Sequence, residues 1–253
     1  MSKRPKEILD YLLTFRFLNT RHIQKLLNQN NPTYIQTLLG KLLKSHYVKR
    51  HYSRKTYDAS STPAIYYLAA RSRHILKNND SWNAKVLERI YKEGTRSEKF
   101  IDHCLMLADI YLFFRSQKES KEELHFFTKT ALGAYDYFPE ELPDAYIALK
   151  SKRKTKRYFL DLFDPSLPPR FIRRRLRAYL AYEQDGSWQD ATGDSYLPSI
   201  LFVLPSENMK KHINYYAKAK LENELDDTIS LFLTTTISIK NAKNNSNIWQ
   251  EVV

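Results

Sequence analysis

The chain has 253 residues, of which 42% are hydrophobic and 13% aromatic, which is enough for one large or two small packed domains. It carries 41 Lys and Arg against 28 Asp and Glu, a formal net charge of +13. No run approaches the roughly 18 apolar residues that a membrane-spanning helix needs, and no signal-peptide pattern follows the basic start. The single cysteine, Cys104, cannot form an internal disulfide, so we expect a buried thiol in a cytoplasmic protein.

The positive charge is concentrated in the first third of the chain. Residues 1–80 contain 15 Lys and Arg against 4 Asp and Glu, a net charge of +11, whereas the remaining 173 residues carry +2. Charge this uneven is typical of a surface that meets a polyanion such as nucleic acid. The alternative is a solvated basic surface that only keeps the protein soluble.

Apolar residues at helical spacing predict a first helix over Lys6–Phe15 and a short second helix, capped by Asn19 or Thr20. Asn31 followed by proline is typical of an N-cap and first helical residue, so we expect a third helix over Pro32–Ser45. The face opposite its leucines presents Thr33, Gln36, Thr37, Gly40, Lys41 and Lys44. Small polar residues followed by lysines suit a helix that enters the major groove of DNA.

A hairpin is expected next, from the β-prone segments Tyr47–Tyr52 and Ala64–Leu68, with a polar tip between them. Helices followed by a basic hairpin make a winged helix–turn–helix domain over residues 1–80. The predicted base contacts are Thr33, Gln36, Thr37 and Lys41. The predicted phosphate contacts are Arg21, Lys44, Arg50, Arg54 and Lys55. We interpret His22, His46 and His51 as surface or groove residues, with no metal role.

We expect a connecting helix over residues 81–96, an α/β domain over 97–239 and a polar tail over 240–253. The long apolar helix Ser97–Gln117 is either a dimerisation helix or part of the second core. Further strands are predicted at Leu124–Thr128, Ala145–Leu149, Arg157–Phe163, Ser199–Leu204 and Ile229–Thr234, and further helices at Phe171–Tyr182 and Met209–Leu221. This order predicts an α+β chain, with a mixed α/β layer after the winged helix.

The same order is similar to the core of restriction-endonuclease-like nucleases, in which two acids and a lysine surround a divalent metal. Asp144, after a proline, and Asp161, in the next strand, match the two acids. Phe163 stands where the lysine is expected and can neither donate a proton nor bind charge. The resemblance therefore implies a degenerate nuclease core, with Asp144 and Asp161 as weak catalytic candidates. Mg²⁺ is expected only if nuclease activity is retained, and otherwise we predict no metal or cofactor.

A second basic region lies between residues 150 and 177, with 11 Lys and Arg against 2 Asp. It combines a predicted hairpin turn with the start of a helix, both of which can bind phosphates. The residues singled out are Lys152, Arg153, Lys154, Lys156, Arg173, Arg174 and Arg175. A second nucleic-acid contact, an acidic protein partner and a plain solvated face all remain open.

Five segments carry a resemblance to one known family: residues 12–23, 39–50, 64–69, 142–146 and 159–161. Together they resemble the replication-relaxation family of plasmids and other bacterial mobile elements. The resemblance implies an amino-terminal winged helix and a role in plasmid replication, mobilisation or their control. Members often have Glu where Asp161 stands and another acid two residues later, where this chain has Phe163.

Our first hypothesis is a sequence-specific, dimeric protein that binds double-stranded DNA, as a replication or transfer factor or a transcriptional regulator. The first alternative is a metal-dependent nuclease or nicking enzyme that uses Asp144 and Asp161. The second alternative is a scaffold that binds an acidic protein through its second basic region. No membrane partner is expected.

Overall fold

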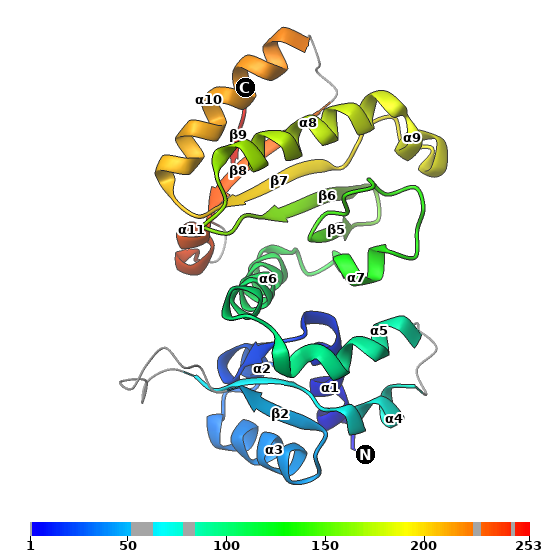
Figure 1. Cartoon of the computed structure of the whole chain (residues 1–253), viewed down its shortest axis with the longest axis vertical. Coiled ribbons are helices and arrows are strands. Elements are labelled where there is room, and N and C mark those ends of the chain that lie inside the picture. The colour runs from blue at the N-terminus through cyan, green and yellow to red at the C-terminus, as the bar shows by residue number, and fades with distance from the viewer. Residues whose placement is uncertain (1, 52–62, 78–83, 225–228, 244–245) are drawn as a thin grey trace. The chain divides into compact units, whose positions relative to one another are not determined.

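The computed structural model describes residues 2–51, 63–77, 84–224, 229–243 and 246–253. The chain divides into two compact units, Met1–Leu112 and Phe113–Val253, coloured from blue to green and from green to red in Figure 1. The division falls inside the helix α6 (Glu98–Gln117), whereas we expected the second domain to begin at residue 97. The physical reason is that Ile101 and Cys104 of α6 are buried against Phe17 of the first unit.

The first unit begins with helices and short strands that alternate along the chain. Its described elements are α1 (Lys3–Phe15), β1 (Leu18–Asn19), α2 (Thr20–Leu26), α3 (Pro32–Lys44), β2 (Val48–His51), β3 (Ile65–Leu68), η2 (Ala70–Ser72), α4 (Arg73–Leu76), α5 (Ala84–Glu88) and η3 (Arg89–Thr95). The strands form an antiparallel sheet in the order β1-β3-β2. Within it, Tyr66 lies opposite both Leu18 and Arg50.

The apolar spacing in α1 accounts for the core of this unit. Ile8, Leu9, Leu12 and Leu13 recur at helical spacing, and each is at most 1% exposed. Burying each of these side chains contributes about 1.5–3 kcal/mol relative to leaving it in water. The buried face of α1 therefore holds the helix against the rest of the unit.

A buried carboxylate ties the start of the chain to η3. Glu93 is 3% exposed and accepts two hydrogen bonds from the Arg16 guanidinium, at 2.9 and 3.0 Å. Arg96 lies 3.8 Å from the same carboxylate. Since an unpaired buried charge is strongly destabilising, this pairing fixes η3 against the end of α1.

The second unit is a mixed sheet with helices. Its described elements are β4 (Glu123–Thr128), α7 (Lys129–Leu132), β5 (Ala145–Lys150), β6 (Thr155–Leu162), α8 (Pro169–Asp185), α9 (Ser187–Thr192), β7 (Ser199–Leu204), α10 (Glu207–Glu224), β8 (Leu231–Thr235), α11 (Thr236–Asn241) and β9 (Gln250–Glu251). The six-stranded sheet has the order β4-β5-β6-β7-β8-β9. The pairs β6–β7 and β7–β8 are parallel and the others are antiparallel, so the predicted mixed α/β layer is confirmed.

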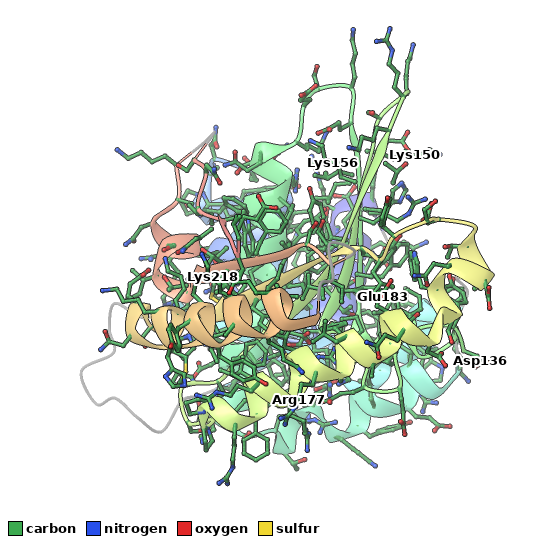
Figure 2. The ribbon with its side chains drawn as sticks, turned by 90° about the horizontal axis from the view of Figure 1, so that it is seen from above. Asp136, Lys150, Lys156, Arg177, Glu183 and Lys218 are labelled. Atoms are coloured by element: carbon green, nitrogen blue, oxygen red, sulfur yellow. The ribbon has the colours of Figure 1, made fainter. Side chains whose placement is uncertain are left out.

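Helices α8 and α10 connect the parallel strands and lie side by side (Figures 1 and 2). Their apolar sides pack on the sheet, where Ile172 and Leu176 of α8 and Phe202 of β7 are fully buried. Trp188 of α9 is 2% exposed and joins the same core. This core holds the start of α8 next to the end of β6.

The last residues differ from the polar tail that we expected. Gln250–Glu251 forms β9, which pairs antiparallel with β8, and the Val252 amide donates to the Leu231 carbonyl oxygen at 3.0 Å. Val252 is 9% exposed and packs in the core of the sheet. The polar sequence before β9 gave no sign of this strand, because Val252 becomes buried only when β9 pairs with β8.

Candidate nucleic-acid interface

Helix α3 begins at a well-formed cap. The Asn31 side-chain oxygen accepts hydrogen bonds from the amides of Thr33 and Tyr34, at 3.0 and 3.3 Å, and Pro32 is the first helical residue. These bonds satisfy two of the amides that a helix start leaves without a partner. The predicted cap is therefore confirmed, and it fixes where the exposed face of α3 begins.

The two faces of α3 differ sharply in chemistry. Ile35, Leu38, Leu39 and Leu42 are buried, at 0%, 7%, 1% and 3% exposure. All five residues of α3 that we predicted to contact DNA are exposed: Thr33, Gln36, Thr37, Lys41 and Lys44. The structure therefore gathers these five side chains on the face opposite the leucines. Amide, hydroxyl and ammonium groups on one face can donate to base edges and phosphates.

Elements beside α3 carry the other predicted phosphate contacts. Arg21 is exposed on α2, and Arg50 is exposed on β2. Both α2 and β2 contact α3, so these arginines lie on elements adjoining the candidate helix. Arg54 and Lys55, which we predicted at the hairpin tip, lie outside the described residues.

The histidines do not all lie on the surface, as we expected. His22 is 4% exposed, and its Nε2 lies 2.9 Å from Oδ1 of Asp109. His51 Nε2 lies 2.9 Å from Oε1 of Glu98, while His46 is exposed. His22 also closes the capping box of α2 with Asn19, so its position is set by the helix start as well as by α6. His22 is a packing residue, which corrects the sequence-based interpretation.

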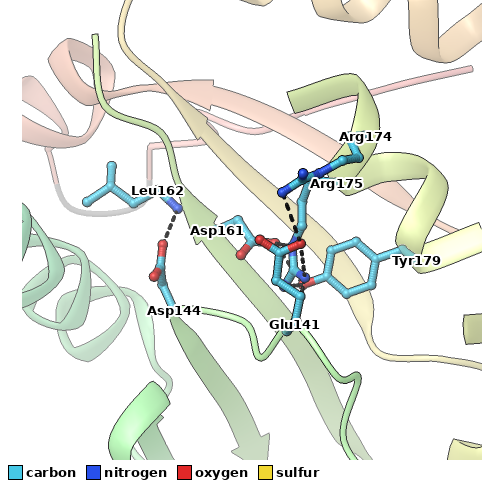
Figure 3. A network of polar contacts seen from close by, with 7 residues as sticks. All are labelled: Glu141, Asp144, Asp161, Leu162, Arg174, Arg175 and Tyr179. Carbon is cyan, nitrogen blue, oxygen red and sulfur yellow. Dashed lines mark hydrogen bonds and ion pairs between the residues drawn. The ribbon is translucent and has the colours of Figure 1, made fainter. Parts of the chain in front are cut away.

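The two candidate catalytic acids lie at the same end of paired strands. Asp144 immediately precedes β5, and its neighbour Ala145 lies opposite Leu160 of β6, which places Asp144 beside Asp161. One oxygen of Asp144 accepts a hydrogen bond from the Leu162 amide at 2.9 Å (Figure 3). The predicted pairing of the acids is therefore present in the register of the strands.

Asp161 is enclosed by side chains from α8 (Figure 3). Its Oδ2 accepts hydrogen bonds from Arg175 Nε at 2.8 Å and from the Tyr179 hydroxyl at 2.7 Å. Arg175 also donates to the Glu141 carbonyl oxygen and, at 2.8 Å, to the Tyr179 hydroxyl. Asp161 and Arg175 are 6% and 4% exposed, so the network is closed from water.

Burial dominates the electrostatics of this network. It raises the pKa of Asp161 above its usual value, while Arg175 acts in the opposite direction. Burial and the neighbouring Asp161 together raise the pKa of Tyr179 well above its usual value. Burial would lower the pKa of Arg175, but Tyr179 and Asp161 outweigh it, and the pKa rises. The guanidinium is therefore a permanent cation beside Asp161.

These residues do not fit a nuclease metal centre. The Arg175 guanidinium and the Tyr179 hydroxyl both bind Oδ2 of Asp161, so a cation already neutralises this carboxylate. Phe163, at the expected lysine position, is 8% exposed and packs on Phe202 with ring centroids 4.9 Å apart. In the part of the chain that the structure describes, no group of three or more His, Cys, Asp or Glu could hold a metal ion. Asp161 is thus part of a buried ion pair with Arg175, whereas Asp144 is half-buried and accepts the Leu162 amide.

A family model for replication-relaxation matches residues 9–195. The chain belongs to the replication-relaxation family. Among curated proteins, none matches it. Among solved structures, the restriction endonuclease FokI is similar at 12% identity and a TM-score of 0.35, over 93% of this chain and 43% of that one. The chain thus spans less than half the length of that enzyme, and so distant a likeness carries no conclusion about activity.

In this replication-relaxation family member, the second basic region is divided into two parts. Lys152, Arg153 and Lys154 lie in the turn between β5 and β6, and Ser151 bonds to both the amide and the carbonyl of Lys154. Arg173 and Arg174 lie near the start of α8, which follows the far end of β6. The turn lies at one end of β6 and the start of α8 lies near the other, and the eight residues of this strand span roughly 23 Å. Figure 2 likewise shows Lys156 and Arg177 well apart.

Arg175 does not belong to either exposed group, because its side chain is turned inward to Asp161. Sequence reasoning missed this role, although a signal was present. Ile172, Arg175, Leu176 and Tyr179 recur at spacings of three and four, which puts Arg175 on the apolar stripe of its helix. An arginine in such a stripe needs a buried acidic partner, and Asp161 is the one acid in β6, among the apolar residues at its end.

Throughout the described ranges, no helix combines the length and apolar character needed to cross a bilayer.

Proposed function

We propose that this chain is a sequence-specific, double-stranded DNA-binding protein of a plasmid or mobile element, acting in replication, transfer or transcriptional control. In this proposal residues 1–80 of the first unit form a winged helix–turn–helix domain, and α3 is its recognition helix. The observation that carries the proposal is the face of α3, where Thr33, Gln36, Thr37, Lys41 and Lys44 are exposed opposite buried leucines.

Three other observations support it. The element order from α1 to β3 and the β1-β3-β2 sheet support a winged helix–turn–helix. Residues 1–80 carry a net charge of +11, which suits the phosphate backbone. Family membership is consistent with a role in replication. A homodimer would let two copies of α3 read a palindromic site, and it belongs to the proposal.

The test is a salt titration of binding to the DNA upstream of the chain's own gene, against a scrambled duplex. Specific readout should favour the native site by about a thousandfold. Lys41→Ala should reduce both affinity and discrimination, because Lys41 is assigned to bases. Lys44→Ala should weaken both duplexes about equally and lower the salt slope by about one, because it is assigned to a phosphate.

Lys92→Ala is the matched control, since Lys92 is an exposed lysine on η3 and the substitution removes the same charge. It should leave the preference for the native site unchanged. Equal loss of preference in the Lys92 and Lys41 variants would overturn the assignment of α3. Absence of DNA affinity above background at physiological salt would instead favour a scaffold that binds an acidic protein.

A further inference from the structure

An exposed row of aromatic side chains lies at the outer edge of the second unit's sheet. His125 and Phe127 alternate on one face of β4, and their side chains are 45% and 40% exposed. Their rings lie parallel to within 4°, with centroids 6.4 Å apart. Across the strand pair, Phe127 lies opposite Tyr146 of β5, with centroids 6.2 Å apart and an interplanar angle of 21°. We call His125, Phe127 and Tyr146 the aromatic row.

The inner end of the aromatic row is fixed by the core. Tyr146 lies 5.9 Å from the Trp188 ring, and Trp188 packs edge-on against Phe159 at 5.4 Å. Trp188 and Phe159 are 2% and 0% exposed. The row therefore begins in close-packed core and ends in solvent, so its outer rings are held in place before any ligand arrives.

Cations adjoin the aromatic row at one end. Residues 150–156 contain Lys150, Lys152, Arg153, Lys154 and Lys156 and no acid. Lys150 shares the row's face of β5, because it is two and four residues beyond Ala148 and Tyr146. Two acids lie beside the row: Glu123, opposite Lys150, lies 3.6 Å from His125, and Asp194 lies 3.2 Å from Arg157. Each therefore has a basic neighbour.

We propose that the aromatic row stacks the bases of a single-stranded nucleic acid, whose phosphates meet the basic turn of residues 150–156. Every base has a π-face, so stacking on His125 and Phe127 needs no particular sequence. A basic turn beside stacked rings supplies the charge that a single strand requires. This site does not rest on the duplex-binding proposal, since all of its residues belong to the second unit.

The experiment measures binding of a fluorescein-labelled oligo(dT) of 20 nucleotides to the full chain by fluorescence anisotropy. Phe127→Leu retains an apolar side chain but loses the aromatic face, and it should weaken binding about tenfold. Phe127→Trp keeps an aromatic face at this position and should bind oligo(dT) at least as tightly as wild type. Tyr215→Leu is the matched control, because Tyr215 is 80% exposed on α10, outside the row, and this variant should bind like wild type.

Equal oligo(dT) affinities for wild type and Phe127→Leu would overturn the proposal. A Phe127→Leu variant that binds oligo(dT) normally but changes its sedimentation would also overturn it, and would identify the row as a protein interface. The duplex-binding proposal is tested separately, because Lys41→Ala should change duplex binding alone. Loss of oligo(dT) binding by Phe127→Leu, with duplex binding retained, would support the aromatic row whatever the outcome for α3.

Discussion

Asp161 and Arg175 show how one pair of residues changes the meaning of a motif. Asp144 and Asp161 are neighbours in the strand register, but Oδ2 of Asp161 is already bound by the guanidinium of Arg175. Asp161 and Arg175 are both almost fully buried. The pair therefore contributes to the packing of α8 against β6.

Arg175→Met should lower the free energy of unfolding by about 3–5 kcal/mol, because it leaves Asp161 buried without its partner. Urea denaturation measures the loss. The double variant Asp161→Asn/Arg175→Met should be less destabilised than Arg175→Met alone, since no charge remains buried. Arg174→Met is the control: its side chain is 62% exposed on the same helix, and it should change stability by at most about 0.5 kcal/mol. A loss of that small size for Arg175→Met would contradict the pairing.

Gly40 is a second residue whose role the structure clarifies. It lies inside α3, and no atom lies within 4 Å of a Cβ added there. Gly40→Ala should therefore stabilise the protein by about 0.5–1 kcal/mol, because alanine has the higher helix propensity. Gly186→Ala is the comparison: its φ of +73° is unfavourable for alanine, so thermal denaturation should show a lower Tm. A lower Tm for Gly40→Ala would indicate a contact within the protein that the structure lacks.

At the scale of elements, the caps decide where the helices of the first unit begin. Asn19 and Asn31 both accept backbone hydrogen bonds, at 2.8 Å from the His22 amide and 3.0 Å from the Thr33 amide. Both caps were visible as polar residues before apolar, periodic segments. The helices they start confirm the predictions for this part of the chain to within a few residues.

Asn31→Ala should destabilise the first unit by about 1 kcal/mol, because the amides of Thr33 and Tyr34 lose their acceptor. Circular dichroism during urea denaturation measures the change. Asn30→Ala replaces the neighbouring exposed asparagine and should alter stability by less than about 0.5 kcal/mol. Equal effects at both positions would show that the Asn31 cap does not hold α3.

At the scale of the whole molecule, the buried Tyr179 and, more weakly, the half-buried Tyr182 link stability to alkaline pH. Burial is the largest cause of the raised pKa values of Tyr179 and Tyr182. In the unfolded chain these groups ionise near pH 10. The folded state resists ionisation, so their contribution to stability is complete below pH 10 and is lost as the pH rises above it.

We therefore expect the free energy of unfolding to fall above pH 10, by up to about 1.4 kcal/mol per pH unit for each such tyrosine. Tyr179→Phe should be less stable at pH 8, because it loses the hydrogen bond to Asp161, but its decline above pH 10 should be shallower. Urea denaturation at pH 8, 10 and 11 separates the two effects. Identical declines for wild type and Tyr179→Phe would contradict the assignment.

The sequence by itself determined the local elements and the chemistry of α3. A continuous apolar run predicted β7 over Ser199–Leu204, and the cap and leucines of α3 predicted its exposed polar face. These features depend on residues close in the chain, whose spacing follows from helix and strand geometry. The family could also be recognised at this level.

Only the tertiary structure decided how distant residues meet. It turned Arg175 inward to Asp161, buried His22 against Asp109, separated Lys154 from Arg174 and aligned Phe127 with Tyr146. Each outcome depends on strand register or on helix packing between residues far apart in the chain. Local propensity does not predict such contacts. A charged side chain needs a partner only when it is buried, and burial arises only when the whole sheet and its helices assemble.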